Sequence, residues 1–244
     1  TLNSGPSGSH WLGTDSRGGD ILIRVLVGAR ASLMVGAIVV VASVLVALPL
    51  GLASGYIGGL FDAIVMRIMD ALFAFPSITL AVVISGVLLG NRGVSTNESL
   101  LVCGLAISVT FVPGLVRILR AQVLAVREEN FVEASRSVGV TEGRMVRKHI
   151  FPNVVSPLIV QVALTFGYAI IAEAGLSFLG FGVQGFTPSW GTMLQSGYDE
   201  IFSQQLPILV PGLAILFTVL AANLIADGLR DAMGRETYVM KEAE

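Results

Sequence analysis

Charged side chains are scarce along this chain. Of its 244 residues, 13% are charged and 54% are hydrophobic, whereas soluble domains carry about 25% charged residues. So few charged groups leave too little polar surface to cover a water-soluble globule. The net charge of −2 creates no field that would attract nucleic acid, so we expect no nucleic-acid partner.

Cysteine and histidine are scarcer still. The single cysteine, Cys103, excludes an intramolecular disulfide framework and a cysteine-based metal cluster. The two histidines, His10 and His149, lie far apart in the sequence, and a zinc site needs more neighbouring ligands than these. The chain also lacks a glycine-rich phosphate loop that contains lysine. We therefore predict no metal site, no nucleotide site and no catalytic residue in this chain.

Long uncharged runs make up much of what is present. A helix needs about 20 mostly apolar residues to cross a bilayer. Five segments approach or exceed this length: 31–53, 71–91, 99–116, 150–172 and 201–226. The third is the shortest and continues with helical spacing toward its basic end. The sequence therefore predicts an all-α integral membrane protein with five transmembrane helices.

Lys and Arg are unevenly distributed between the connecting segments. If the start of the chain is external, three segments are cytoplasmic: 54–70, 117–153 and 227–244. Three others are then external: 1–30, 92–98 and 173–206. The cytoplasmic set holds eleven of the fifteen Lys and Arg residues, and the external set holds four. Because positive residues concentrate on the cytoplasmic side, we predict an external start and a cytoplasmic C-terminus.

These assignments divide the chain into an external N-terminal segment, 1–30, and a membrane domain, 31–244. Within the membrane domain, 127–153 is predicted to be a cytoplasmic loop and 173–206 an external loop. An external start without a signal sequence predicts a further helix before Thr1.

The cytoplasmic loop begins with the pattern of a short helix. Phe131, Val132, Ser135 and Val138 have helical spacing and are predicted to share one face. Gly139 interrupts the pattern and is predicted to end the helix in a left-handed conformation.

A second short helix is predicted to follow. Thr141 is expected to cap it, and it carries Met145, Val146 and Ile150 before Pro152 ends it. The apolar residues of this helix pair have no evident core to enter. We therefore predict that the loop docks another protein; a helical hairpin lying on the membrane surface is the alternative.

The same loop resembles the cytoplasmic loop shared by permeases of ABC importers. The pattern of that family is Glu-Ala-Ala, three residues, Gly, nine residues, Ile, one residue, Leu-Pro. Here Glu133, Ala134 and Ser135 stand for its first three positions. Gly139 follows after three residues, and Pro152 lies thirteen residues beyond that glycine, as the pattern requires.

Three positions depart from the pattern. Ser135 replaces the second alanine, His149 stands where Ile is common, and Phe151 replaces Leu. The ending His-Ile-Phe-Pro-Asn is similar to the His-Ile-Leu-Pro-Asn ending that is usual in the peptide branch of the family. The resemblance implies an ATPase-coupling loop formed by Glu133, Ala134, Ser135, Gly139, Val140, Ile150 and Pro152.

The N-terminal segment also resembles a permease sequence. Residues 10–15 read His-Trp-Leu-Gly-Thr-Asp and are followed by Gly18 and Asp20, which resembles the motif His-x-Leu-Gly-Thr-Asp-x-x-Gly-Arg-Asp of dipeptide and oligopeptide permeases. Gly19 stands where Arg is usual in that family. Residues 28–33, Gly-Ala-Arg-Ala-Ser-Leu, continue the resemblance.

Two later stretches complete the match. Residues 176–182 read Leu-Ser-Phe-Leu-Gly-Phe-Gly and, with Gln184 and 188–191, resemble the external loop of the same subunit. Residues 227–232 resemble its ending. The resemblance covers nearly the whole chain and is closest to the second permease subunit of dipeptide and oligopeptide importers, a group that includes nickel and glutathione transporters.

This resemblance implies the transmembrane fold of type I ABC importers, normally with six helices, so the first helix would precede this chain. It implies a bacterial or archaeal cytoplasmic membrane as the location. The implied partners are a second homologous permease subunit, two cytoplasmic ABC ATPase subunits and an external solute-binding protein. ATP and Mg would be bound by the ATPase subunits, with no cofactor in this chain.

The implied function is import of di- or oligopeptides, with nickel or glutathione as the alternative solute. An ATP-independent transporter and a membrane enzyme are the other classes; no serine and histidine fall together within the spans, which disfavours the enzyme. Glu173 and Asp227 are ionisable residues at the ends of spans, where such residues are candidates for a functional role; a structural role is the favoured interpretation of both. We predict that Glu173 reaches interfacial water and that Asp227 pairs with Arg230, one helical turn on.

Overall fold

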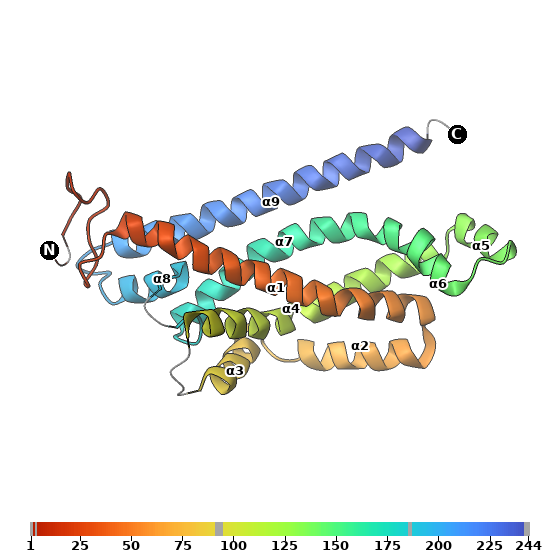
Figure 1. Cartoon of the computed structure of the whole chain (residues 1–244), viewed down its shortest axis with the longest axis horizontal. Helices are drawn as coiled ribbons and strands as arrows, with labels where there is room; N and C mark the ends of the chain where they lie inside the picture. Colours follow the sequence, from red (N-terminus) through yellow and green to blue (C-terminus); the bar gives the residue numbers. More distant parts are fainter. Residues whose placement is uncertain (1, 3, 91–94, 185–186, 242–244) are drawn as a thin grey trace. The chain divides into compact units, whose positions relative to one another are not determined.

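A computed structural model describes residues 2, 4–90, 95–184 and 187–241. Regular structure in these ranges is helical, apart from one isolated antiparallel bridge between Thr14 and Asp20 (Figure 1). The elements in chain order are α1 (Ile21–Ile57), α2 (Gly59–Phe73), α3 (Ser77–Leu89), α4 (Thr96–Arg127), α5 (Asn130–Ser137), α6 (Glu142–Met145), a π-helical turn (Val146–Ile150), α7 (Phe151–Phe178), α8 (Trp190–Tyr198) and α9 (Leu206–Lys241). Residues 1, 3, 92–94 and 185–186 of the predicted external segments, and 242–244 of the predicted cytoplasmic end, lie outside the described residues.

Four helices are long and apolar enough to cross a membrane: Ile21–Ile57, Thr96–Arg127, Glu142–Phe178 and Leu206–Met233. The pair formed by α2 and α3 makes a fifth if it is counted as one broken span. The all-α membrane fold predicted from the uncharged runs is therefore confirmed. Each of the four long helices contains a proline, which neighbouring helices and local re-bonding tolerate in a membrane.

The prediction of one continuous span at 71–91 is wrong. The helix stops at Phe73 and restarts at Ser77, with Pro76 between them in an extended conformation, φ −56° and ψ 125°. Proline also disfavours helical backbone in the residue before it, so the break falls at Phe75. The uncharged sequence on both sides hid this interruption.

The segment 54–70, predicted to connect two spans, is largely helical. Helix α1 continues to Ile57, and the chain reverses at Gly58 and Gly59, whose φ angles are +70° and +59°. Only glycine adopts such angles without strain, so two residues suffice for the connection. Because α2 contains three charged residues, its composition resembles that of a loop, and the sequence predicts a connection there instead of a helix.

The chain divides into two compact units. Unit 1 comprises Thr1–Val40, Pro76–Thr110 and Phe166–Ala222, and unit 2 comprises Val41–Phe75, Phe111–Thr165 and Asn223–Glu244. Close helix packing in unit 1 depends on small residues. A Cβ at Gly36 would lie 2.9 Å from Ile170 Cδ1, and one at Gly104 would lie 2.5 Å from Ile38 Cγ2.

In unit 2, α1 and α4 approach each other at two glycines. A Cβ at Gly51 would lie 2.6 Å from Leu119 Cβ, and one at Gly55 would lie 2.7 Å from Val123 Cβ. Leu119 and Val123 belong to a buried apolar cluster that also includes residues of α2, α5 and α7. This cluster, the unit 2 core, includes Val132, Met145 and Ile150 of the loop 127–153 described below.

Charged residues of α2 make contacts to α4 within unit 2. Arg120 donates to both carboxylate oxygens of Asp62, at 2.5 Å each, and Ser54 also donates to Asp62. Arg117 pairs with Asp70 and stacks over the Phe73 ring, 4.6 Å from its centroid. These inter-helix pairs explain why an apolar chain retains charges at these positions.

Candidate functional site

The predicted cytoplasmic loop, 127–153, lies in unit 2 and is anchored in its core. Helix α5 inserts Val132, which is fully buried, into the unit 2 core. Phe131 is exposed and Val138 is 80% exposed. The prediction that these residues share one face is therefore wrong, because the helix begins at Asn130 with only Val132 directed inward.

The second part of the loop is anchored in the same way. Met145 and Ile150 are 1% and 0% exposed and belong to the unit 2 core. The expectation that the apolar residues of this loop have no core to enter is wrong for both, and for Val132. Thr141 occupies the predicted capping position but makes no side-chain cap; instead its carbonyl accepts the Met145 N–H at 2.9 Å.

Pro152 does not end the helix as predicted. The chain stays helical from Glu142 to Phe178, and Pro152 is the second residue of α7. A proline clashes with the carbonyl four residues earlier, and a wider π-helical turn can relieve such a clash. The turn Val146–Ile150 directly precedes it, and Asn153 Nδ2 donates to the His149 carbonyl at 2.6 Å.

The tip of the loop is a glycine-ended helix terminus. Gly139 has φ +80°, its N–H donates to the Arg136 carbonyl at 2.9 Å, and the Val140 N–H donates to the Ser135 carbonyl at 3.2 Å. This pair of bonds defines a Schellman motif. The predicted left-handed conformation of Gly139 is confirmed. No atom outside its chain neighbours lies within 4 Å of a Cβ placed there, so the tip is open.

The seven residues assigned to the coupling loop separate by exposure. Glu133, Ala134, Gly139 and Pro152 are exposed, Ser135 and Val140 are half-buried, and Ile150 is buried. The first helix and the tip therefore form an exposed surface, whereas Ile150 is buried beneath it in the unit 2 core. Val140 packs against the unit 2 core, which fixes the chain directly after the tip.

Two residues that could not be identified from the sequence connect the end of α1 to this loop. The Tyr56 hydroxyl donates a hydrogen bond to the carboxylate of Glu142 at the start of α6. Arg127 donates to the Tyr56 carbonyl at 3.1 Å. These residues lie 86 and 71 positions apart from their partners, so no local pattern in the sequence could reveal the contacts.

The N-terminal motif folds into a cluster of hydrogen-bonded polar residues in unit 1, the N-terminal polar cluster. Gly13 and Gly18 have φ angles of +81° and +75°, which accounts for glycine at both positions. His10 Nδ1 lies 2.8 Å from Asp20 Oδ2, and Asp20 Oδ1 accepts the Ile23 N–H at 3.1 Å as an N-cap of α1. The hydrogen bond to His10 is the main cause that lowers the pKa of Asp20.

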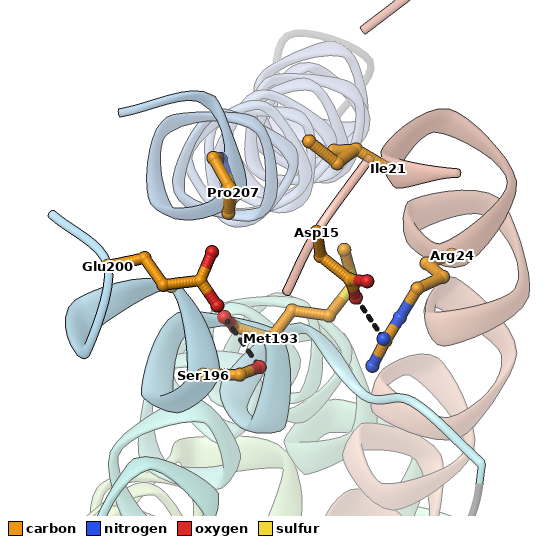
Figure 2. A pocket seen from close by; sticks show the side chains of 8 residues that line it. Asp15, Ile21, Arg24, Met193, Ser196, Glu200 and Pro207 are labelled. Carbon is orange, nitrogen blue, oxygen red and sulfur yellow. Dashed lines mark hydrogen bonds and ion pairs between the residues drawn. The ribbon is translucent and has the colours of Figure 1, made fainter. Parts of the chain in front are cut away.

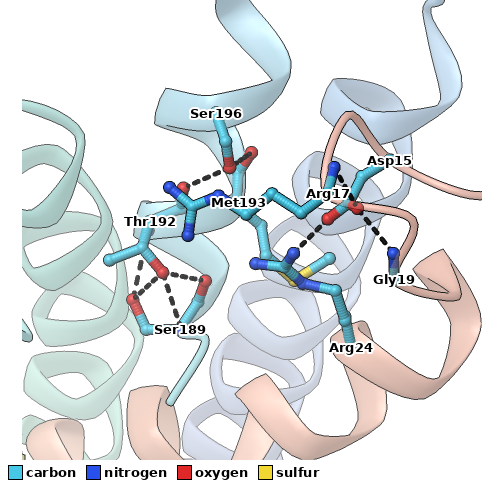
Figure 3. Close-up of polar contacts among 8 residues, drawn as sticks. All are labelled: Asp15, Arg17, Gly19, Arg24, Ser189, Thr192, Met193 and Ser196. Carbon is cyan, nitrogen blue, oxygen red and sulfur yellow. Dashed lines mark hydrogen bonds and ion pairs between the residues drawn. The ribbon is translucent and has the colours of Figure 1, made fainter. Parts of the chain in front are cut away.

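Asp15 makes the largest number of contacts in the N-terminal polar cluster described above. Its carboxylate pairs with Arg24 (Figure 2), and it accepts the N–H groups of Arg17 and Gly19 at 3.0 and 2.8 Å (Figure 3). A Cβ at Gly19 would lie 2.8 Å from Arg24 Cδ. The Arg24 side chain therefore occupies the space beside position 19, where the resembling permeases have Arg.

The cavity beside this ion pair is too small for a solute. Its volume is about 10 Å³, and its lining includes Asp15, Arg24, Ser196 and Glu200 (Figure 2). A cavity of that size holds at most one water molecule. Among the described residues, Glu200 Oε2 is buried there without a hydrogen-bond partner.

Glu173 is fully buried, so the prediction that it reaches interfacial water is wrong. Ser32 of α1 donates to Glu173 Oε2 at 2.9 Å, and Ser177 of α7 donates to Glu173 Oε1 at 2.7 Å. The same two hydroxyls accept backbone N–H groups, from Trp190 and Val183 respectively, at 3.1 Å each. This Glu173 cluster connects α1, α7, α8 and the loop between α7 and α8.

The sequence offered only a partial signal for this cluster. Ser32, Ser177 and Trp190 each lie in a stretch that resembles permeases, but their separation in the chain concealed that they converge.

The predicted pair of Asp227 and Arg230 is confirmed, with 3.7 Å between Arg230 Nη1 and Asp227 Oδ1.

Comparison with known proteins gives consistent matches. Residues 47–237 match the family of binding-protein-dependent transport system inner membrane components. The chain is 43% identical over 229 residues to the dipeptide transport system permease protein DppC of Alkalihalophilus pseudofirmus, covering 94% of this chain and 73% of that protein. It is 39% identical over 232 residues to the glutathione transport system permease protein GsiD of Pectobacterium atrosepticum, covering 95% and 74%.

Solved structures give the same fold at low sequence identity. The inward-facing MetNI methionine ABC transporter matches with a TM-score of 0.70 and 18% identity, over 87% of this chain and 97% of that one. An amino acid ABC transporter solved with histidines matches with a TM-score of 0.63 and 14% identity, over 87% and 93%. The helical arrangement is thus that of an ABC importer permease.

Proposed function

Because this chain belongs to the family of binding-protein-dependent transport system inner membrane components, it is a multi-pass permease of an ABC importer, and we propose that it imports di- and oligopeptides. The similarity to a dipeptide permease, at 43% identity, supports this solute. The glutathione permease is only slightly less similar, at 39%, so glutathione, itself a peptide, is the second candidate.

We propose that the loop 127–153 couples this permease to ATPase subunits. This proposal is supported by the Schellman motif at Gly139, which is exposed at the surface of unit 2. The neighbouring residues Val132, Met145 and Ile150 are buried in the unit 2 core. A coupling element must be exposed to contact a partner and anchored to transmit the partner's movement. The surface formed by Glu133, Ala134 and Gly139 meets both conditions.

The chemistry of ATP hydrolysis then belongs to the partners. The importer family implies ATPase and solute-binding partners in general. We propose two cytoplasmic ATPase subunits that bind ATP and Mg, a second homologous permease subunit and an external solute-binding protein. ATP binding would switch the permease between inward-facing and outward-facing states, a bistable element biased by a ligand at a distant site.

The orientation of the chain follows from its basic residues. We propose that Gly139 is cytoplasmic and Gln184 external, because eleven of the fifteen Lys and Arg residues fall in the segments on the first side. Single cysteines at these positions should react with a membrane-impermeant maleimide from opposite sides of the membrane. Cys103 is buried, so Cys103→Ala, which buries no hydroxyl, provides the background. Labelling of both positions from the same side would contradict the proposed topology.

A further inference from the structure

Unit 1 contains a cavity of about 510 Å³ between the end of α3 and the loop that follows α7. Its lining includes Ser85, Gly86 and Gly90 from the α3 side and Gly180, Phe181 and Gln184 from the loop. Small-molecule sites occupy about 300–1,000 Å³. The cavity therefore has the size of a solute site, unlike the cavity beside Asp15.

The backbone around this cavity is held in place from both sides. Ser85 Oγ donates to the Phe181 carbonyl. Ser99 Oγ of α4 accepts a hydrogen bond from the Gln184 N–H at 3.1 Å and donates one to the Gln184 carbonyl oxygen at 3.4 Å. The positive φ of Gly180, +84°, turns the chain out of α7 into this position.

The Gln184 side chain is the one part of this residue that remains uncommitted. Its backbone is bonded to Ser99, whereas its amide group makes no hydrogen bond to another residue in the described ranges. An amide on a fixed backbone, with both its donor and its acceptor free, matches a peptide group, which offers the complementary acceptor and donor.

The charge of the lining restricts the solute further. Among the described residues that line the cavity, none is ionisable. A nickel ion would require imidazole, thiolate or carboxylate ligands, and a dianionic solute would favour Arg or Lys partners. The C-terminal end of α3 faces the cavity at Gly90 and carries the negative end of the helix dipole, which attracts a cationic group such as a peptide ammonium.

We propose that this cavity is a peptide subsite of the permease, in which the Gln184 amide hydrogen-bonds the main chain of a short peptide and the end of α3 faces its ammonium group. The subsite rests on the proposed function, which supplies the peptide and places Gln184 on the external side. There it receives the solute before it crosses the membrane.

The test is photo-crosslinking in the complete importer, reconstituted in proteoliposomes with its ATPases and binding protein. The probe is a radiolabelled dipeptide of alanine and benzoylphenylalanine. Its adducts on this chain should map to residues 85–90 and 180–184, and an excess of unlabelled alanyl-alanine present during irradiation should prevent their formation. Adducts confined to other segments, or adducts that form equally well with the competing dipeptide present, would overturn the subsite.

Uptake of alanyl-alanine provides the second readout. Gln184→Leu keeps the side-chain volume but removes the amide, and should lower uptake at subsaturating peptide about five- to tenfold, the effect of one lost hydrogen bond. Gln195→Leu is the matched control, because Gln195 is exposed on α8 and does not line the cavity; it should keep uptake within about twofold.

The outcomes separate the two proposals. Unchanged uptake in Gln184→Leu, while the wild-type importer transports the peptide, would overturn the subsite and leave the proposed function standing. A wild-type importer that transports no peptide would overturn the proposed function and the subsite with it.

Discussion

Gly139→Val is expected to leave the subunit in the membrane at wild-type level while uncoupling ATP hydrolysis from uptake. The φ angle of +80° at Gly139 costs a non-glycine residue about 1–2 kcal/mol, and a β-branched side chain also adds bulk at the open tip. The membrane spans do not include this position, so insertion should be unaffected. Uptake and solute-stimulated ATPase activity of the reconstituted complex measure the effect; we expect uptake to fall more than tenfold.

Two control variants separate coupling from strain. Gly139→Asn should retain most of the uptake, because asparagine tolerates the left-handed conformation. Gly59→Val imposes similar strain at φ +59°, also without atoms within 4 Å of its Cβ, but at the turn between α1 and α2. If Gly59→Val uncouples as strongly as Gly139→Val, or if Gly139→Val is fully coupled, the tip is not the ATPase contact.

Glu173→Ala is expected to cause the largest loss of stability. It removes the acceptor of two buried hydroxyls, Ser32 and Ser177, whose remaining bonds hold the Trp190 and Val183 N–H groups. Leaving a buried polar group unpaired costs about 1–3 kcal/mol, so the two together cost about 2–6 kcal/mol. The melting midpoint of the purified complex and the amount of subunit in the membrane should both fall.

Two further variants should lose less stability than Glu173→Ala. Glu173→Gln keeps one acceptor and fills the same volume, so we expect less than half the loss of Glu173→Ala. Glu98→Ala is the matched control, because Glu98 is an exposed carboxylate of the same unit, and it should change stability by no more than about 0.5 kcal/mol. Equal melting midpoints for Glu173→Ala and Glu98→Ala would show that the Glu173 cluster does not stabilise the protein.

The parts of the fold that depend on local chemistry could be predicted from the sequence. Uncharged runs locate the long helices because a bilayer requires internal satisfaction of every backbone polar group over about 20 residues. The Gly139 turn could be predicted because glycine is the residue that most often ends a helix in the left-handed conformation. The break at Pro76 was obscured because its flanking residues are apolar on both sides, so the hydropathy of 71–91 is continuous.

Contacts between distant segments were not predictable in this way. The sequence predicts no core for Val132, Met145 and Ile150, because nothing in the loop itself indicates that α4 and α7 provide one. The sequence predicts that Glu173 reaches water, because Ser32 and Ser177 can both donate to it only once α1 and α7 pack together. In both cases tertiary packing determined the environment of the residue.

Accumulation of a radiolabelled dipeptide in proteoliposomes tests the account most directly. The complete complex contains this chain, its second permease subunit and its ATPases, with the binding protein on the external side. We predict that the dipeptide accumulates above its external concentration with ATP and Mg, and not with a non-hydrolysable ATP analogue. Accumulation or equilibration at the same rate without ATP hydrolysis would contradict the assignment of this chain as a permease of an ATP-driven peptide importer.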